Sequence, residues 1–172
     1  MARPGAVTFQ GNPLTLSGEA VSAGQAAPGF TTHFFDGALK TVTLEDVKGK
    51  PTLISVVPSL DTGVCQEQTK KFNEALGELG DQVNAITVSL DLPFAQLRFC
   101  SEADISNMQT VSDYQDRNFG ISWGMLVEEL KLLARGVFVL DPDAKIVHAE
   151  VLSEMTDEPD YGSAMTALKA QC

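Results

Sequence analysis

The residues best placed to do chemistry lie in one short stretch, VVPSLDTGVCQEQTKKF, residues 56–72. A run of β-branched residues ends at Pro58, Thr62 follows, and Cys65 comes three residues later, where a charged helical pattern begins. A cysteine attacks only as its thiolate. With the ordinary thiol pKa of ~8.5, only about 3% of a free thiol is ionised near neutrality. A reactive cysteine here therefore needs neighbours that favour the charged sulfur.

The start of a helix supplies part of that stabilisation, about 0.5–2 kcal/mol, through its unpaired N–H groups. Lowering a thiol pKa to ~6 needs roughly 3.4 kcal/mol, so a cation is required as well. The Thr62 hydroxyl can accept from a local N–H while donating to the sulfur, and Pro58 can shield the sulfur from water. Simpler interpretations stay open: Thr62 as a helix cap, Pro58 as a strand end and Cys65 as a small core residue.

Composition and charge exclude several classes of function. The 172 residues are 44% hydrophobic and 20% charged, which is typical of one globular domain. The net charge of −11 argues against nucleic acid or a membrane surface as a partner. No apolar stretch approaches the ~20 residues of a membrane span, and the N-terminus lacks the apolar core of a signal peptide. We therefore expect a cytoplasmic protein.

The cysteines and histidines point away from structural cross-links and metals. Cys65, Cys100 and Cys172 are too few and too scattered for a disulfide scaffold, and no C-x-x-C is present. His33 and His148 stand alone, whereas a structural zinc site normally has four ligands in paired short spacings. We expect no metal and no cofactor. The cysteines are therefore left with two possible roles, thiol chemistry or inert burial.

Three nearly continuous apolar runs predict buried central strands: Thr52–Pro58, Val83–Leu90 and Gly136–Leu140. A helical pattern from about Cys65 to Leu79 lies between the first two runs. This order predicts a right-handed parallel crossover. The segment Phe94–Ser101 is predicted to be a short helix that carries the second cysteine.

The two ends of the chain complete the pattern. Residues 1–20 contain two short alternating runs around Gly11-Asn12, which predict a β-hairpin. FVLDPDAKIVHAEVL predicts a second hairpin, and residues 160–170 predict a terminal helix with Asp160 as its N-cap. This is the order of a thioredoxin-like α/β sandwich, a central mixed sheet flanked by helices. We expect residues 1–172 to form one such domain, with residues 1–20 as an N-terminal extension.

One motif and four further stretches of the chain carry a family resemblance. Residues 58–65 match P-x-x-x-T-x-x-C, which resembles the peroxidatic loop of peroxiredoxins. The string VPSLDTGVC is similar to that of the bacterial thiol peroxidases, an atypical two-cysteine peroxiredoxin subfamily. The stretches FQGNPLTL, DLPFAQLRFC, LLARGVFVLD and EPDYGSAMTALK resemble the same subfamily in the same order. The chain is identified as a member of it.

The resemblance implies roles for five residues. Cys65 is the expected peroxidatic nucleophile, with Thr62 and Pro58 of the same motif beside it. Arg135 matches the arginine that faces the thiolate, and a guanidinium suits this task because it stays charged and offers several fixed donors. Cys100 matches the resolving cysteine.

Position alone leaves other interpretations of the last two residues open. Arg135 can be an ordinary strand-end arginine in a surface ion pair. Cys100 can be a thiol buried on the helix face that it shares with Phe94 and Leu97. The family pattern gives Cys172 no role.

The implied function is a thiol peroxidase that reduces hydrogen peroxide and organic hydroperoxides in antioxidant defence. It would work through a sulfenic acid at Cys65 and an intrachain disulfide with Cys100, with thioredoxin as reductant and a homodimer as the assembly. We expect disulfide formation to need local unfolding. A disulfide requires Cα atoms ~4.4–6.8 Å apart, whereas packed helices have axes ~8–10 Å apart.

Two other functions compete with this one. A thioredoxin-like dithiol–disulfide oxidoreductase normally uses C-x-x-C, which is absent. A non-catalytic interaction module would carry inert thiols. Peroxide titration separates the possibilities, because rapid loss of two thiols favours the peroxidase and slow general oxidation favours the inert module.

Overall fold

A seven-stranded mixed sheet forms the centre of the computed structural model, which describes all residues 1–172. Its strand order is β11-β10-β5-β6-β7-β3-β4. The parallel strands are β5 (Thr52–Val56), β6 (Asn84–Ser89) and β7 (Gln109–Ser112). The antiparallel strands are β10 (Gly136–Leu140), β11 (Ile146–Val151), β3 (Thr31–Phe35) and β4 (Leu39–Thr43). The predicted central strands and the parallel crossover between the first two are confirmed.

A second, smaller sheet contains the predicted N-terminal hairpin. Its order is β1-β2-β8-β9, formed by β1 (Ala2–Phe9), β2 (Asn12–Ser17), β8 (Leu126–Val127) and β9 (Leu132–Leu133). The hairpin is therefore integrated with the rest of the fold through the antiparallel pairing of β2 with β8.

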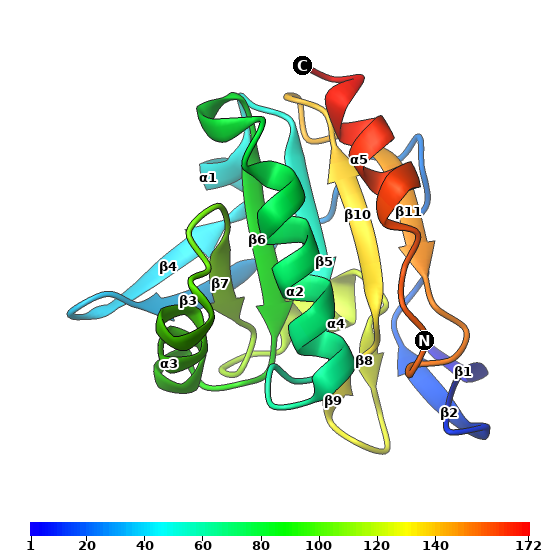
Figure 1. The fold of residues 1–172 in the computed structure, drawn as a ribbon. Coiled ribbons are helices and arrows are strands. Elements are labelled where there is room, and N and C mark those ends of the chain that lie inside the picture. The colour runs from blue at the N-terminus through cyan, green and yellow to red at the C-terminus, as the bar shows by residue number, and fades with distance from the viewer.

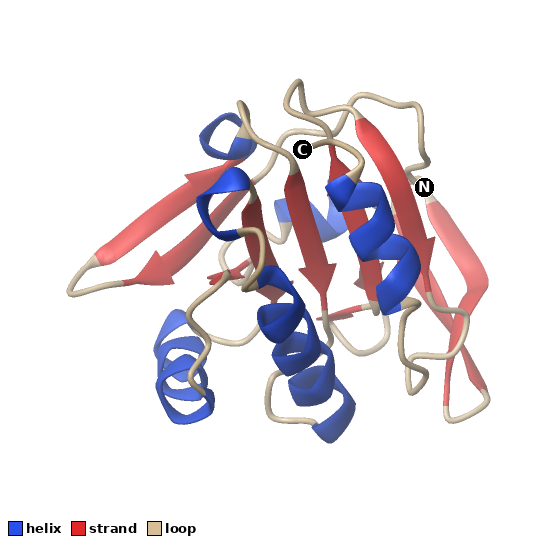
Figure 2. Ribbon diagram, turned by 45° about the horizontal axis from the view of Figure 1, so that its top comes forward, coloured by secondary structure: helices blue, strands red, loops and turns tan.

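Helices cover both faces of the large sheet. They are α1 (Leu44–Val47), α2 (Gly63–Leu76), the 3₁₀ turn η1 (Gly80–Gln82), α3 (Pro93–Ala103), α4 (Asn118–Ser122) and α5 (Tyr161–Lys169). Figures 1 and 2 show α2, α3 and α5 in front of this sheet, with α4 and the smaller sheet behind it. This arrangement confirms the predicted thioredoxin-like sandwich.

Two apolar clusters on opposite faces explain the continuous hydrophobic runs of the central strands. Successive side chains of a strand point to opposite faces. Leu53 belongs to the cluster with Phe72 of α2 and Leu168 of α5, whereas its neighbour Ile54 belongs to the larger cluster with Trp123. A strand buried on both sides favours apolar residues on both faces, which gives a nearly continuous hydrophobic run.

The helix that carries Cys65 begins earlier than its apolar pattern predicts. It runs over Gly63–Leu76 rather than from Cys65 to Leu79, which makes Cys65 its third residue. The terminal helix agrees with prediction, because Asp160 accepts a hydrogen bond from the Ser163 N–H at 3.0 Å.

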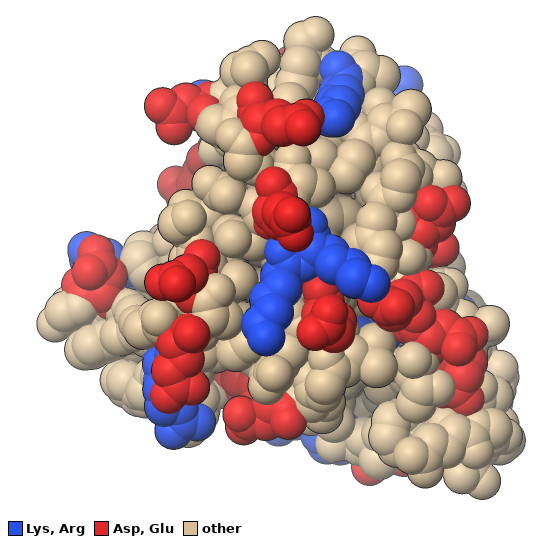
Figure 3. Space-filling model, in the orientation of Figure 1, with Lys and Arg blue, Asp and Glu red and all other residues tan.

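None of the helices is both long and apolar enough to cross a membrane. Figure 3 shows the face that carries α2 and α5, where a few basic side chains stand among many acidic ones. This face offers no continuous basic surface of the kind that contacts a phosphate backbone.

Candidate active site

Cys65 lies at the junction between the end of β5 and the first turn of α2. The chain leaves β5 after Val56, makes one more sheet hydrogen bond from Val57 N to Val88 O at 3.1 Å, and enters α2 at Gly63. The Cys65 side chain has no exposed surface and shares a small apolar cluster with Val57 and Leu60. Burial alone would suit an inert core cysteine.

Two polar groups contact the sulfur and distinguish it from a core thiol. Thr62 Oγ1 lies 2.7 Å from Cys65 Sγ, and Nη2 of Arg135 lies 3.3 Å from it. Thr62 Oγ1 is also 2.9 Å from the Ser59 carbonyl oxygen. A hydroxyl has one proton. It can donate that proton to the carbonyl while accepting a hydrogen bond from a thiol, or it can rotate and donate to a thiolate. Thr62 occupies the N-cap position, but its side chain makes no capping hydrogen bond.

Arg135 is held from three sides within the protein. Its Nε donates to the Met155 carbonyl at 2.8 Å, its Nη1 donates to Gln68 Oε1 at 3.0 Å, and its Nη2 faces the sulfur of Cys65. Gln68 is in turn fixed by donating to Ser55 Oγ at 2.8 Å. Arg135 is only 2% exposed, so it is not a residue of a surface ion pair.

The backbone after Arg135 requires glycine. A Cβ on Gly136 would lie 2.7 Å from the carbonyl oxygen of Glu150 and 2.9 Å from Cε of Met125. Because β10 pairs with β11 at this point, only glycine lets the chain pass that closely. Gly136 pairs with Val56, so the preceding Arg135 lies beside the end of β5, from which the chain turns towards α2.

A cavity of ≈ 360 Å³ opens above these groups. Its wall consists of Phe9, Pro58, Ser59, Thr62, Gly63, Val64, Leu130, Leu132, Arg135, Met155 and Thr156. Thr62 and Arg135 are the two wall residues that touch the Cys65 sulfur. The cavity therefore combines a polar base, formed by Thr62 and Arg135, with a wall that is largely apolar.

The N-terminal hairpin is fastened where it contributes Phe9 to that wall. The carboxylate of Glu154 accepts from Gly11 N at 2.8 Å, Thr8 Oγ1 at 3.0 Å and Thr156 N at 2.9 Å. These bonds, led by the one from Gly11 N, lower the pKa of Glu154 to about 2. The ionised carboxylate of Glu154 therefore fastens the tip of the hairpin beside the cavity wall.

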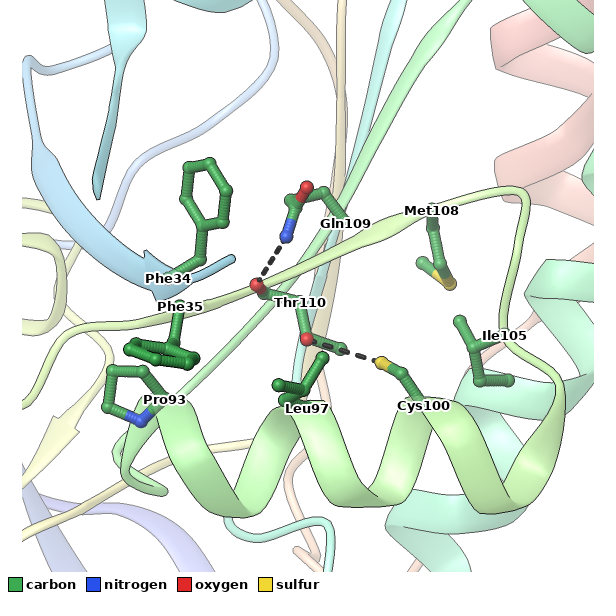
Figure 4. A pocket seen from close by; sticks show the side chains of 9 residues that line it. All are labelled: Phe34, Phe35, Pro93, Leu97, Cys100, Ile105, Met108, Gln109 and Thr110. Carbon is green, nitrogen blue, oxygen red and sulfur yellow. Dashed lines mark hydrogen bonds between the residues drawn. The ribbon is translucent and has the colours of Figure 1, made fainter. Parts of the chain in front are cut away.

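Cys100 lies on α3 in a different environment. Its thiol is half-buried and Sγ is 3.3 Å from Thr110 Oγ1. Burial raises the pKa of Cys100, and the Thr110 contact opposes this only in part. Figure 4 shows Cys100 at the edge of a second cavity of ≈ 160 Å³, with Phe34 and Phe35 of β3 across from it.

The helix face of Cys100 is more exposed than the buried-thiol interpretation requires. Phe94 and Leu97 are 54% and 44% exposed. All three cysteines of the chain are free thiols. Cys100 and Cys65 contact different groups, but Phe99, the residue before Cys100, packs against the apolar cluster that includes Cys65.

Four of the five predicted site residues meet at one place, and the fifth lies on a neighbouring segment. Cys65, Thr62 and Arg135 are in direct contact, and Pro58 lines the cavity above them. Sequence reasoning missed Gln68, although its spacing of three residues from Cys65 places both on one face of a helix. The Met155 carbonyl could not be foreseen, because a backbone acceptor leaves no signal in a sequence.

The chain is similar to known proteins over most of its length. The Redoxin family model matches residues 22–165. A thiol peroxidase from Bacillus subtilis is 49% identical over 164 residues, which cover 95% of this chain and 96% of that protein. A thiol peroxidase from Halalkalibacterium halodurans is 51% identical, with coverage of 95% and 97%.

Solved structures of other proteins share the fold of this chain. A peroxiredoxin-like protein from Aquifex aeolicus superposes with a TM-score of 0.88 at 37% identity, over 96% of both chains. A thiol peroxidase from Chromobacterium violaceum has the same fold, with a TM-score of 0.83 at 20% identity over 95% of both chains.

Proposed function

The chain belongs to the redoxin family as a peroxiredoxin-type thiol peroxidase, and from this premise we propose that it reduces peroxides through Cys65 and Cys100. The observation that carries the proposal is the contact of Cys65 Sγ with both Thr62 Oγ1 and the Arg135 guanidinium at the base of a cavity. A buried guanidinium beside the sulfur can stabilise the negative charge that develops there and on a bound peroxide.

In the first step the thiolate attacks the nearer oxygen of the peroxide. The new S–O bond forms as the O–O bond breaks, so that the thiolate, the hydroperoxide and a proton give a sulfenic acid and an alcohol or water. Arg135 stabilises the negative charge that develops on the leaving oxygen, and Thr62 orients the peroxide by hydrogen bonding. Pro58 limits the access of water to the sulfur.

In the second step the Cys100 thiol attacks the sulfenic sulfur. An S–S bond forms, the S–OH bond breaks and one water leaves, so that Cys100 is oxidised and the sulfenic acid is reduced. The two sulfurs start in separate environments, beside Arg135 and Thr110 respectively, and the segments around them must rearrange before they meet. A dithiol then reduces the disulfide.

Membership of the family also suggests the reductant, the substrates and the assembly. We propose thioredoxin as the dithiol, hydrogen peroxide and organic hydroperoxides as substrates, and a cytoplasmic homodimer in which residues 1–172 form one domain. The apolar cavity wall of Phe9, Leu132 and Met155 supports the inclusion of organic hydroperoxides.

A peroxide titration followed by mass spectrometry tests the proposal. Wild-type protein treated with one equivalent of hydrogen peroxide is expected to lose two thiols and to contain a Cys65–Cys100 disulfide within one chain. Cys65→Ser should lose turnover and keep its fold, and Cys100→Ser should stop at a sulfenic acid that dimedone labels. A disulfide from Cys65 to Cys172, or to another chain, would refute the assignment of Cys100. Turnover by Cys65→Ser would refute that of Cys65.

A further inference from the structure

One carboxylate links the two segments that carry the cysteines. Asp91 lies between β6 and α3, and it accepts hydrogen bonds from Ser59 Oγ at 2.7 Å and from Leu60 N at 2.8 Å. Ser59 and Leu60 belong to the loop that leads from β5 into the helix of Cys65. Ser59 donates to Oδ1 and Leu60 donates to Oδ2, so both oxygens of the carboxylate bind the loop.

Asp91 is itself anchored to the sheet. Ser89 Oγ, at the end of β6, donates to Asp91 Oδ2 at 2.7 Å, and Ser112 Oγ, at the end of β7, donates to the Asp91 carbonyl. Gln96 of α3 donates to Ser89 Oγ at 3.0 Å. The carboxylate is therefore a fixed point, and the loop of residues 59–61 is the part that can detach from it.

The loop of residues 59–61 also contacts the groups around Cys65. The Ser59 carbonyl is the acceptor of Thr62 Oγ1, and the Leu60 carbonyl accepts from the side chain of Gln66 in the first turn of α2 at 3.0 Å. Leu60 also packs against Cys65 in the cluster that Phe99 covers. Detaching the loop from Asp91 would thus release the groups that hold Cys65 in contact with Thr62.

We propose that Asp91 is a positioning residue, a latch that holds Cys65 in its peroxide-reactive arrangement and opens before the sulfur meets Cys100. The proposal rests on the proposed function. Hydrogen bonds to an ionised acceptor are stronger than neutral ones, and Leu60 N is buried, so the latched form dominates in the reduced protein. The fraction of unlatched molecules then sets how fast the sulfenic acid is converted to the disulfide.

The test compares oxidation and disulfide formation in Asp91→Asn. The amide keeps the shape of the carboxylate but loses its charge and one acceptor oxygen. Weakening the latch should raise the unlatched fraction, and with it the rate of disulfide formation, by about tenfold. As long as the latched form stays in the majority, the rate of Cys65 oxidation by hydrogen peroxide should change by less than about twofold. Rapid quenching with dimedone and mass spectrometry resolves the two steps.

Asp46→Asn is the matched control. The Asp46 carboxylate also accepts from a backbone N–H and a hydroxyl, those of Thr43 at 2.8 and 3.0 Å, but at the start of α1. Both rates should stay at their wild-type values in this variant. Ser59→Ala removes one latch bond from the other side and should accelerate disulfide formation in the same direction as Asp91→Asn, which keeps the proposal testable if Asp91→Asn does not fold.

Hydrogen exchange on the reduced protein separates failure of the latch from failure of the proposed function. Asp91→Asn should increase exchange of peptides within residues 57–66 and leave the peptides of α5 unchanged. This readout does not depend on which cysteine resolves the sulfenic acid. Unchanged exchange, or a slower Cys65 oxidation without faster disulfide formation, would overturn the latch. Absence of any Cys65–Cys100 disulfide in the wild type would instead overturn the proposed function.

Discussion

The guanidinium of Arg135 lies 3.3 Å from the sulfur of Cys65, and none of the ion pairs of the protein gives that guanidinium a carboxylate partner. Its other donors go to neutral acceptors, the Met155 carbonyl and Gln68 Oε1. A buried cation without a counter-charge is costly. The guanidinium is therefore placed to stabilise negative charge that develops at the sulfur and on a peroxide bound beside it.

Replacing Arg135 should therefore affect reactivity more than folding. In Arg135→Ala we expect the rate constant with hydrogen peroxide to fall by about 10²–10³, because the guanidinium no longer stabilises the charge that develops on the leaving oxygen. Arg135→Lys should retain part of the rate, because it keeps the charge and loses the fixed fork of donors. Arg98→Ala, which changes an exposed arginine on α3, is the control. A rate constant of Arg135→Ala with hydrogen peroxide equal to that of wild type would contradict this role.

Thr62 should act through its hydroxyl. Thr62→Ser keeps the Oγ that lies 2.7 Å from the sulfur, whereas Thr62→Val keeps the shape and removes it. We expect kcat/KM for hydrogen peroxide to fall by about 10² in Thr62→Val and by less than about tenfold in Thr62→Ser. Thr62→Val also loses the hydrogen bond to the Ser59 carbonyl, so the free energy of unfolding should fall by about 0.5–1.5 kcal/mol in that variant. Equal rates in the two variants would show that the hydroxyl takes no part.

The sequence predicts the parts of the fold and site that depend on local signals. The buried strands β5, β6 and β10 appear as continuous apolar runs, and the Pro58–Cys65 motif marks the site by itself. The strands β8 and β9 have two residues each, which is too short for any periodicity to register. They exist because the N-terminal hairpin offers β2 as a partner.

Long-range polar contacts are the main features that the sequence could not supply. Asp91 and Leu60 are 31 positions apart, and Arg135 and Gln68 are 67 apart. An acidic residue after a strand is commonly a turn or cap residue, so its type alone did not suggest that Asp91 holds the loop before Cys65. The start of α2 at Gly63 was likewise set by the geometry of that loop rather than by the apolar spacing of the helix.

Phe9 should select for organic hydroperoxides. It reaches the cavity wall from the N-terminal hairpin and is 39% exposed, so part of its ring is available to a substrate. Phe9→Ala should lower kcat/KM for cumene hydroperoxide by about tenfold, because apolar contact with the substituent is lost. The value for hydrogen peroxide, which has no substituent, should stay within about twofold. Phe94→Ala, which removes an exposed aromatic ring on α3, should change neither. A parallel loss for both substrates in Phe9→Ala would instead indicate a disturbed site.

Asp113 is a buried carboxylate behind the large sheet. It is 1% exposed and accepts from Phe119 N at 3.0 Å and Gly120 N at 2.8 Å at the start of α4. Burial raises the pKa of Asp113 from 3.8 to about 6, against the opposing effects of these two N–H groups and of the Arg117 charge. The folded state therefore binds the Asp113 proton more tightly than the unfolded state does. Its contribution to stability is complete below about pH 4 and is lost as the pH rises through about 6.

This linkage predicts a pH-dependent difference between wild type and Asp113→Asn. Asn cannot ionise, and its amide offers one acceptor to two N–H groups, so the variant should be less stable at every pH. Between about pH 5 and pH 7.5, however, wild type should lose about 1.4 kcal/mol of unfolding free energy relative to the variant, because only wild type releases the Asp113 proton in that window. Urea denaturation of both proteins across the window measures the difference, and groups that they share cancel. If the difference in unfolding free energy between the two proteins did not depend on pH, the pKa of Asp113 would not be raised by folding. A difference that grows with pH would show that the N–H groups of α4 outweigh burial and hold Asp113 in its ionised form.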